Sequence, residues 1–206
     1  MENLDRSIIT NEILNGSFVK EQLISPNKSV KYGIIGHSLG CGTATNTGDK
    51  SWVRVCIAGF PGERPDTVGG DMLFISSVND GAVSLERLRI NIPTDFVRMN
   101  ENDECIQSSI LNYQPNLEGQ NTITQIPRRT AVVFERANDA PNHISFLADG
   151  VNNAMIDLLS PLLPIAQALQ IPVLDFDKYK LSQDSDRTAK TVIPLVSMYL
   201  RQRMLI

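Results

Sequence analysis

The chain is poor in the side chains that most often hold metal ions, with only two histidines and three cysteines among its 206 residues. Cys41, Cys56 and Cys105 are scattered along the sequence and lack the short spacings of a metal site. Cys41 stands just after a turn and Cys56 within a predicted strand, where a free cysteine behaves as a small apolar side chain. We therefore expect no metal centre, and we expect Cys41 and Cys56 to be buried.

An excess of basic charge and a long apolar run are also lacking. The 19 Lys and Arg residues are outnumbered by 23 Asp and Glu residues, for a net charge of −4. This balance argues against a nucleic-acid binder, which would show a basic face. No apolar run approaches the ~18 residues of a transmembrane helix, so no transmembrane segment is expected. Residues 1–6 show no basic region followed by an apolar stretch, so a cytoplasmic location is the default expectation.

Length and composition indicate one globular domain over residues 1–206. Apolar stretches alternate with segments of helical periodicity, which predicts an α/β fold with a mostly parallel sheet and helices on both faces. The strands are expected at 32–35, 52–58, 72–76 and 129–135, and the helices at 3–14, directly after Ser38, at 147–158 and at 187–204. The last helix is expected to bend at Pro194.

One stretch fits neither pattern. Residues 99–129 are polar, rich in Asn, Glu and Gln, and show little periodicity. We interpret them as an excursion over the surface that forms a partial lid.

The most informative motif is Gly36-His37-Ser38-Leu39-Gly40, which follows an apolar run and precedes small residues. A G-x-S-x-G pattern between a strand and a helix is typical of a nucleophile elbow, a sharp turn that exposes one serine hydroxyl. Gly36 and Gly40 are expected to admit the close contacts of such a turn. Gly42 and Ala44 are expected to let the following helix pack tightly on its sheet.

A serine hydroxyl is a poor nucleophile unless a base removes its proton, and that base is most often a histidine held by a carboxylate. His37 is adjacent to Ser38, and the elbow points adjacent side chains apart. His143, in a loop after the last predicted strand, is therefore the expected base.

The carboxylate is expected in a loop that follows a strand between these two residues. Asp80 in Asn79-Asp80-Gly81 fits, although this is also a favoured turn sequence in which an aspartate needs no function. Asp139, four residues before His143, is the alternative. Asp66 and Asp71 precede the third strand and lie on its wrong side.

An oxyanion hole needs two backbone N–H groups aimed at the developing negative charge. The amide of Leu39, directly after the nucleophile, is the first expected donor. The stretch before the elbow indicates one helix and a connector, without a loop that would supply the second. With one donor, we expect this chain to be a weak catalyst.

Three segments together resemble the α/β-hydrolase superfamily, in the branch that holds chlorophyllases, platelet-activating-factor acetylhydrolases, dienelactone-hydrolase-like proteins and polyester hydrolases. They are residues 36–44, 74–80 and 142–146, and the resemblance extends from about residue 30 to the C-terminus. It implies that Ser38 is the nucleophile, His143 the general base and Asp80 its orienting acid. Members of the family carry three or four further strands before the elbow. We therefore expect a partial α/β-hydrolase fold, the C-terminal portion of the whole.

The function implied by this resemblance is that of a serine hydrolase, which cleaves a small-molecule or lipid-like carboxylic ester through an acyl-enzyme. No metal or organic cofactor is expected, because the nucleophile, the base and the oxyanion amide all come from the protein. The alternative is a non-catalytic hydrolase-like domain that binds a ligand or a partner and keeps these residues as relics.

Overall fold

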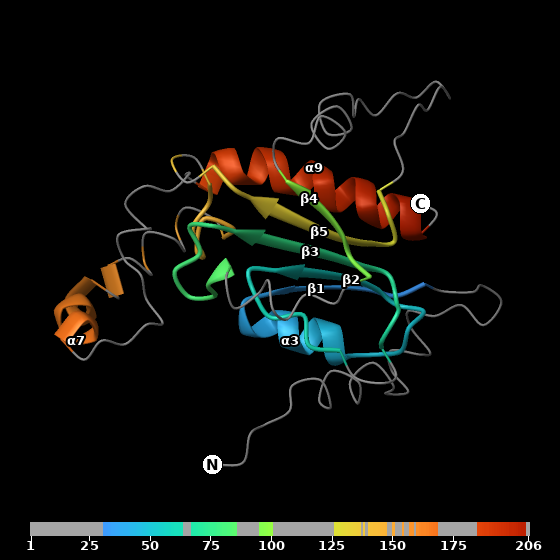
Figure 1. Ribbon diagram of the computed structural model, residues 1–206, viewed down its shortest axis with the longest axis horizontal. Coiled ribbons are helices and arrows are strands. Elements are labelled where there is room, and N and C mark those ends of the chain that lie inside the picture. Colours follow the sequence, from blue (N-terminus) through green and yellow to red (C-terminus); the bar gives the residue numbers. More distant parts are fainter. Residues whose placement is uncertain are drawn as a thin grey trace, which may run out of the picture.

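The centre of the fold is a parallel sheet of five strands in the order β1-β2-β3-β5-β4 (Figure 1). The strands are β1 Gly33–His37, β2 Val53–Ile57, β3 Met72–Ser77, β4 Val97–Asn100 and β5 Arg129–Phe134. The computed structural model describes residues 31–63, 67–85, 95–100, 126–136, 138, 140–147, 150, 154, 157–158, 160–168 and 185–204. Every strand pair within these residues is parallel, so all the strands end at the same edge of the sheet.

Two helices lie on opposite faces of this sheet. Helix α3 (Leu39–Asn46) packs on β1 and β2, and helix α9 (Ser185–Met204) crosses the other face. A short 3₁₀ helix η1 (Ser160–Leu162) leads into α7 (Leu163–Ala168). The molecule is therefore an α/β fold with a parallel sheet and helices on both faces, as the alternation of apolar strands and helical segments predicts.

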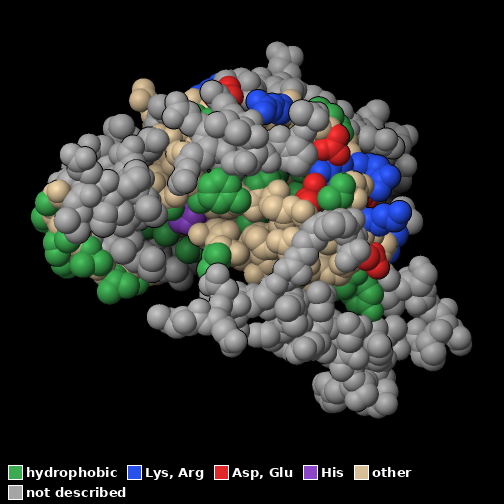
Figure 2. Space-filling view, turned by 60° about the horizontal axis from the view of Figure 1, so that its bottom comes forward, with side chains coloured by type: hydrophobic (Ala, Val, Ile, Leu, Met, Phe, Trp, Pro, Cys, Tyr) green, Lys and Arg blue, Asp and Glu red, His purple; other side chains and the backbone are tan. Residues whose placement is uncertain are grey.

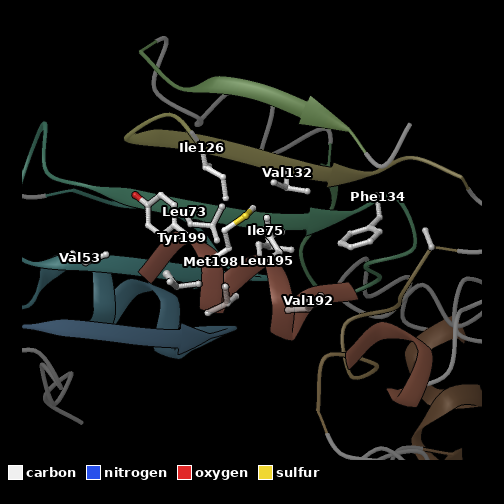
Figure 3. Close-up of a cluster of buried hydrophobic side chains, with 13 residues drawn as sticks. Val53, Leu73, Ile75, Ile126, Val132, Phe134, Val192, Leu195, Met198 and Tyr199 are labelled. Carbon is white, nitrogen blue, oxygen red and sulfur yellow. The ribbon is translucent and has the colours of Figure 1, made fainter. Parts of the chain in front are cut away.

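Side-chain alternation along the strands divides the core into two clusters. Val53, Leu73 and Ile75 point toward α9 and meet Leu195 and Tyr199 in the larger cluster (Figure 3). The neighbouring strand residues point the other way, toward α3, and form a second cluster that includes Cys41, Cys56, Met72, Phe74 and Ala131. Strands β3 and β5 are buried along their whole length, which explains the apolar runs of four residues in each, 72–75 and 131–134.

The four expected strands are confirmed, with ends that differ by at most two residues. Strand β4 was not predicted, because its four residues alternate Val and Met with Arg and Asn at the start of the polar stretch. Its pairing with β5 supplies the order that its own sequence lacks. The expected helix at 3–14 and most of the excursion at 99–129 lie outside the described residues.

The C-terminal helix is confirmed and runs through Pro194 without interruption, and the bend expected there stays a prediction. The helix expected at 147–158 is helical at each of its described positions from 150 onward. Among the described helices, none has the length and apolar character needed to span a membrane.

The buried state of Cys41 and Cys56 is also confirmed, since neither side chain is exposed. The structure adds a disulfide between them, with Cα atoms 4.7 Å apart, which the sequence interpretation missed. It joins the first turn of α3 to β2, close to the turn that carries Ser38.

Candidate active site

Ser38, Asp80 and His143 meet at the carboxyl edge of the sheet. Ser38 directly follows β1, Asp80 stands three residues after β3, and His143 lies in the loop after β5. The three positions are far apart in the sequence. They converge because parallel strands deliver the loops after their carboxyl ends to one edge.

Ser38 occupies a backbone conformation that residues other than glycine rarely adopt, with φ 56° and ψ −122°. Such a conformation costs about 1–3 kcal/mol and persists only where its surroundings enforce it. The amide of Ser38 donates to the carbonyl of Ile57 at 2.9 Å, and its carbonyl accepts from the amide of Cys41 at 2.9 Å. The sheet and the helix thus hold the turn from both sides.

Close backbone contact around this turn explains two glycines. A Cβ atom on Gly36 would lie 2.0 Å from the carbonyl oxygen of Gly40, and one on Gly59 would lie 2.3 Å from that of Ser38. Ala58, next to Gly59, has a positive φ of 50° and donates its amide to Ile75 at 2.8 Å. The backbone directly after β2 therefore lies in close contact with the turn at Ser38, and Gly59 permits this contact.

The expectations for Gly40 and Gly42 were wrong. Among the described residues outside its own helical turn, a Cβ atom on Gly40 or on Gly42 would meet no atom within 4 Å. The backbone of Gly40 forms the close contact with Gly36. A side chain on Gly40 itself would point into open space. The tight packing of α3 on the sheet comes from Ala44, which is 1% exposed, and from Cys41.

The side chains form a continuous hydrogen-bonded chain. The Ser38 hydroxyl oxygen lies 2.8 Å from Nε2 of His143, in position for the O–H to donate to that nitrogen. Nδ1 of His143 lies 3.0 Å from each carboxylate oxygen of Asp80, in position for its N–H to donate to them. This is the convergence that the sequence predicts for the three residues.

Asp80 is fully buried and fixed by the backbone of its own loop. Its Oδ1 accepts hydrogen bonds from the amides of Ala82 at 3.0 Å and Val83 at 2.7 Å. A buried carboxylate needs such partners, since burying a charge without them is costly. The Asn-Asp-Gly turn therefore serves to aim the carboxylate at His143.

Two asparagines that sequence reasoning missed hold the loop of His143 in place. Asn79 donates its Nδ2 to the carbonyl of Ala140 at 2.9 Å and forms an isolated parallel bridge with Asn142. Oδ1 of Asn142 accepts from the amides of Ile144 and Ser145 at 2.9 and 2.8 Å. An asparagine that bonds the backbone two residues ahead is a known turn signal, and it stands directly before His143 in the sequence.

His37 also contacts the loop of His143. Its Nε2 lies 2.8 Å from the carbonyl oxygen of His143, and the two rings are 4.8 Å apart between centroids. Burial lowers the pKa of His37, against the smaller opposing effect of this hydrogen bond. His37 thus stands where its ring supports the backbone of the neighbouring histidine, a contact that the sequence does not reveal.

The remaining predicted residues are placed as follows. Leu39 is the first residue of α3, and a helix leaves the N–H groups of its first turn without intrahelical partners, so its role as an oxyanion donor stays a prediction. Asp71 pairs with Arg128 at 2.5 Å before β3 begins. Asp66 and the alternative acid Asp139 lie outside the described residues.

Within the part of the chain that the structure describes, no three His, Cys, Asp or Glu side chains gather as a metal site would require.

No protein-family model, curated protein or solved structure matches the chain. The class that its fold and site define is an α/β protein with a Ser–His–Asp constellation at the carboxyl edge of a parallel sheet.

The two elbow glycines give a matched test of the turn. Gly36→Ala should lower the free energy of unfolding by about 1–3 kcal/mol or more, because the new Cβ collides with backbone. Gly40→Ala should raise it by about 0.5–1 kcal/mol, because alanine favours the helix and meets open space. Urea unfolding of both variants measures the difference. Equal effects of the two substitutions would contradict the close contact at Gly36.

The lowered pKa of His37 predicts a loss of stability in acid. An unfolded histidine takes up its proton near pH 6.5, whereas the folded chain takes it up at lower pH. Between these values the unfolded state binds more protons, so this contribution is complete above about pH 6.5 and is lost as the pH falls.

Urea unfolding at a series of pH values from about 7.5 to about 5 checks this expectation. The variant His37→Gln keeps an amide donor but does not titrate, so its free energy of unfolding should depend less on pH than that of the native chain. Identical pH dependence in the two proteins would show that His37 is not the group responsible.

Proposed function

We propose that this chain is a serine hydrolase of the α/β-hydrolase superfamily that cleaves carboxylic esters through an acyl-enzyme. The observation that carries the proposal is the 2.8 Å contact between the Ser38 hydroxyl and Nε2 of His143, with Asp80 bonded to the other ring nitrogen. The resemblance of residues 36–44, 74–80 and 142–146 to that superfamily supports the same reading.

In the first half of the reaction, Ser38 Oγ attacks the ester carbonyl while His143 Nε2 takes the hydroxyl proton. The carbonyl π electrons move to oxygen, and a tetrahedral intermediate forms. The amide of Leu39 is the donor that we assign to this oxyanion. The intermediate then expels the alcohol, which leaves with the proton carried by His143, and the acyl group stays on Ser38.

In the second half, a water molecule takes the place of the alcohol. It gives one proton to His143 Nε2 and attacks the acyl carbon, and the new intermediate releases the carboxylic acid as Ser38 recovers its proton. Asp80 holds the ring so that Nε2 faces Ser38, and it stabilises the imidazolium that forms twice per turnover. Its two backbone donors keep it in that position.

The surface beside Ser38 suits an apolar ester. Leu39 is 68% exposed next to Ser38, and Phe60 is 40% exposed next to Gly59, which packs on the Ser38 carbonyl. In Figure 2, part of a histidine side chain is visible beside hydrophobic side chains. Exposed apolar groups at a reactive site favour a substrate with apolar parts, small or lipid-like.

Single and double variants test the mechanism. Ser38→Ala and His143→Ala should each remove nearly all turnover of p-nitrophenyl acetate, because each removes a member of one catalytic unit. The double variant should lose little more, since the remaining member has no partner to act with. Steady-state hydrolysis of the ester measures all three.

Two aspartate variants serve as matched controls. Asp80→Asn should lose on the order of 10⁴-fold, because the amide favours the wrong histidine tautomer. Asp71→Asn removes a carboxylate at the opposite end of β3, where it pairs with Arg128, and should leave kcat close to native. Additive losses in the Ser38 and His143 double variant, or a silent Asp80→Asn, would contradict the proposed roles.

A further inference from the structure

A cavity of about 360 Å³ opens beside the loop of His143, between that loop and the beginning of α9. Phe146 and Leu147 line it from the loop, and Ala189, Val192 and Ile193 line it from the helix. Its volume lies at the lower end of the range of small-molecule sites. Its walls are mainly aliphatic with one aromatic ring, which suits a compact apolar group.

The cavity adjoins the catalytic residues through a short series of rings. Phe146 lies three residues after His143, and its ring centroid is 6.4 Å from that of His37. His37 in turn contacts the carbonyl of His143. A group bound against Phe146 would therefore lie next to the loop that carries the proposed base.

One polar group in the cavity lacks a partner. Ser185, the first residue of α9, lines the cavity and is only 4% exposed. Its hydroxyl has no hydrogen-bond partner in the structure as described. A buried hydroxyl left unpaired is costly, and most such groups in proteins are satisfied. The position of Ser185 thus fits a donor kept for a bound group.

The charge of the cavity disfavours an anion. Among the described residues that line it, Asp186 is the one ionisable residue, and its carboxylate is paired with Lys190 at 2.6 Å on the exposed side of the helix. The partial positive charge at the start of α9 would attract an anion, but Asp186 already occupies that turn. An uncharged ligand avoids both the repulsion and the loss of hydration.

We propose that this cavity binds an uncharged, compact and mainly apolar group of the ester substrate, and that this group accepts a hydrogen bond from the Ser185 hydroxyl. The proposal rests on the proposed function in one respect, namely that the group belongs to an ester cleaved at Ser38. The cavity itself is tested by binding, without any turnover.

Binding is measured by calorimetry on the full chain carrying Ser38→Ala, with three probes that share a phenyl ring. Acetophenone has a neutral acceptor, ethylbenzene has none, and benzoate is anionic. We expect acetophenone to bind most tightly and benzoate most weakly. Adding Ser185→Ala should weaken acetophenone binding about fivefold, the contribution of one neutral hydrogen bond, and leave ethylbenzene unchanged.

A filled cavity gives the second test. Ala189→Phe should abolish binding of acetophenone and ethylbenzene, whereas Arg187→Phe, which adds the same ring to an exposed position in the first turn, should not. Circular dichroism checks that the variants fold, and if Ala189→Phe does not fold, the Ser185→Ala contrast decides alone. Acetophenone affinity that is unchanged by Ser185→Ala, or tighter binding of benzoate, would overturn the proposal.

The link to the substrate is tested by turnover in the chain with native Ser38. It should hydrolyse p-acetylbenzyl acetate with a kcat/KM about fivefold above that of benzyl acetate, and Ser185→Ala should remove this preference. Equal preference in native and variant chains would contradict the assignment of the cavity to the substrate. Binding of acetophenone without any Ser38-dependent hydrolysis would uphold the cavity as a binding site and would sink the proposed function instead.

Discussion

The site depends on one backbone constraint, the turn at Ser38 with its positive φ. The turn is possible because Gly36 lets the backbone of Gly40 approach, and Gly59 lets the carbonyl of Ser38 approach. The disulfide from Cys41 to Cys56 ties the following helix to β2 at the same place. These contacts supply the free energy that keeps a residue other than glycine in an unfavourable conformation. The hydroxyl is thereby held at the tip of the turn, where the loops after β3 and β5 also arrive.

The other two members of the constellation are fixed in a different way. Asp80 is held by amides of its own loop, and the loop of His143 is held by Asn79, Asn142 and His37. Each contact is a hydrogen bond to backbone, so position is set by turns and does not rely on the packing of long side chains. Phe146 of this loop also lines the cavity whose opposite wall is the beginning of α9, where Ser185 stands. The loop that positions His143 thus also forms part of the wall of this cavity.

Much of this arrangement follows from the sequence, because the signals involved are local. The strand ending at His37, the glycine at position 36 and the turn at Asp80 each carry their own pattern. Strand β4 was missed because its order comes from pairing with β5, and the disulfide was missed because two separated cysteines give no spacing signal. The open space at Gly40 could not be predicted either. The motif shows that residues 36 and 40 approach closely, but it does not show which of the two must be glycine. The cavity at α9 joins segments some forty residues apart, and no local pattern predicts it.

The central claim is that His143 and Asp80 make the hydroxyl of Ser38 nucleophilic. A fluorophosphonate reacts covalently with such a serine, and intact-protein mass spectrometry with peptide mapping locates the adduct. The account predicts a single adduct on Ser38, absent from Ser38→Ala and strongly slowed in His143→Ala. A chain that stays unlabelled, or that is labelled at another serine while Ser38 is left free, would contradict it and would favour a hydrolase-like domain that binds without catalysis.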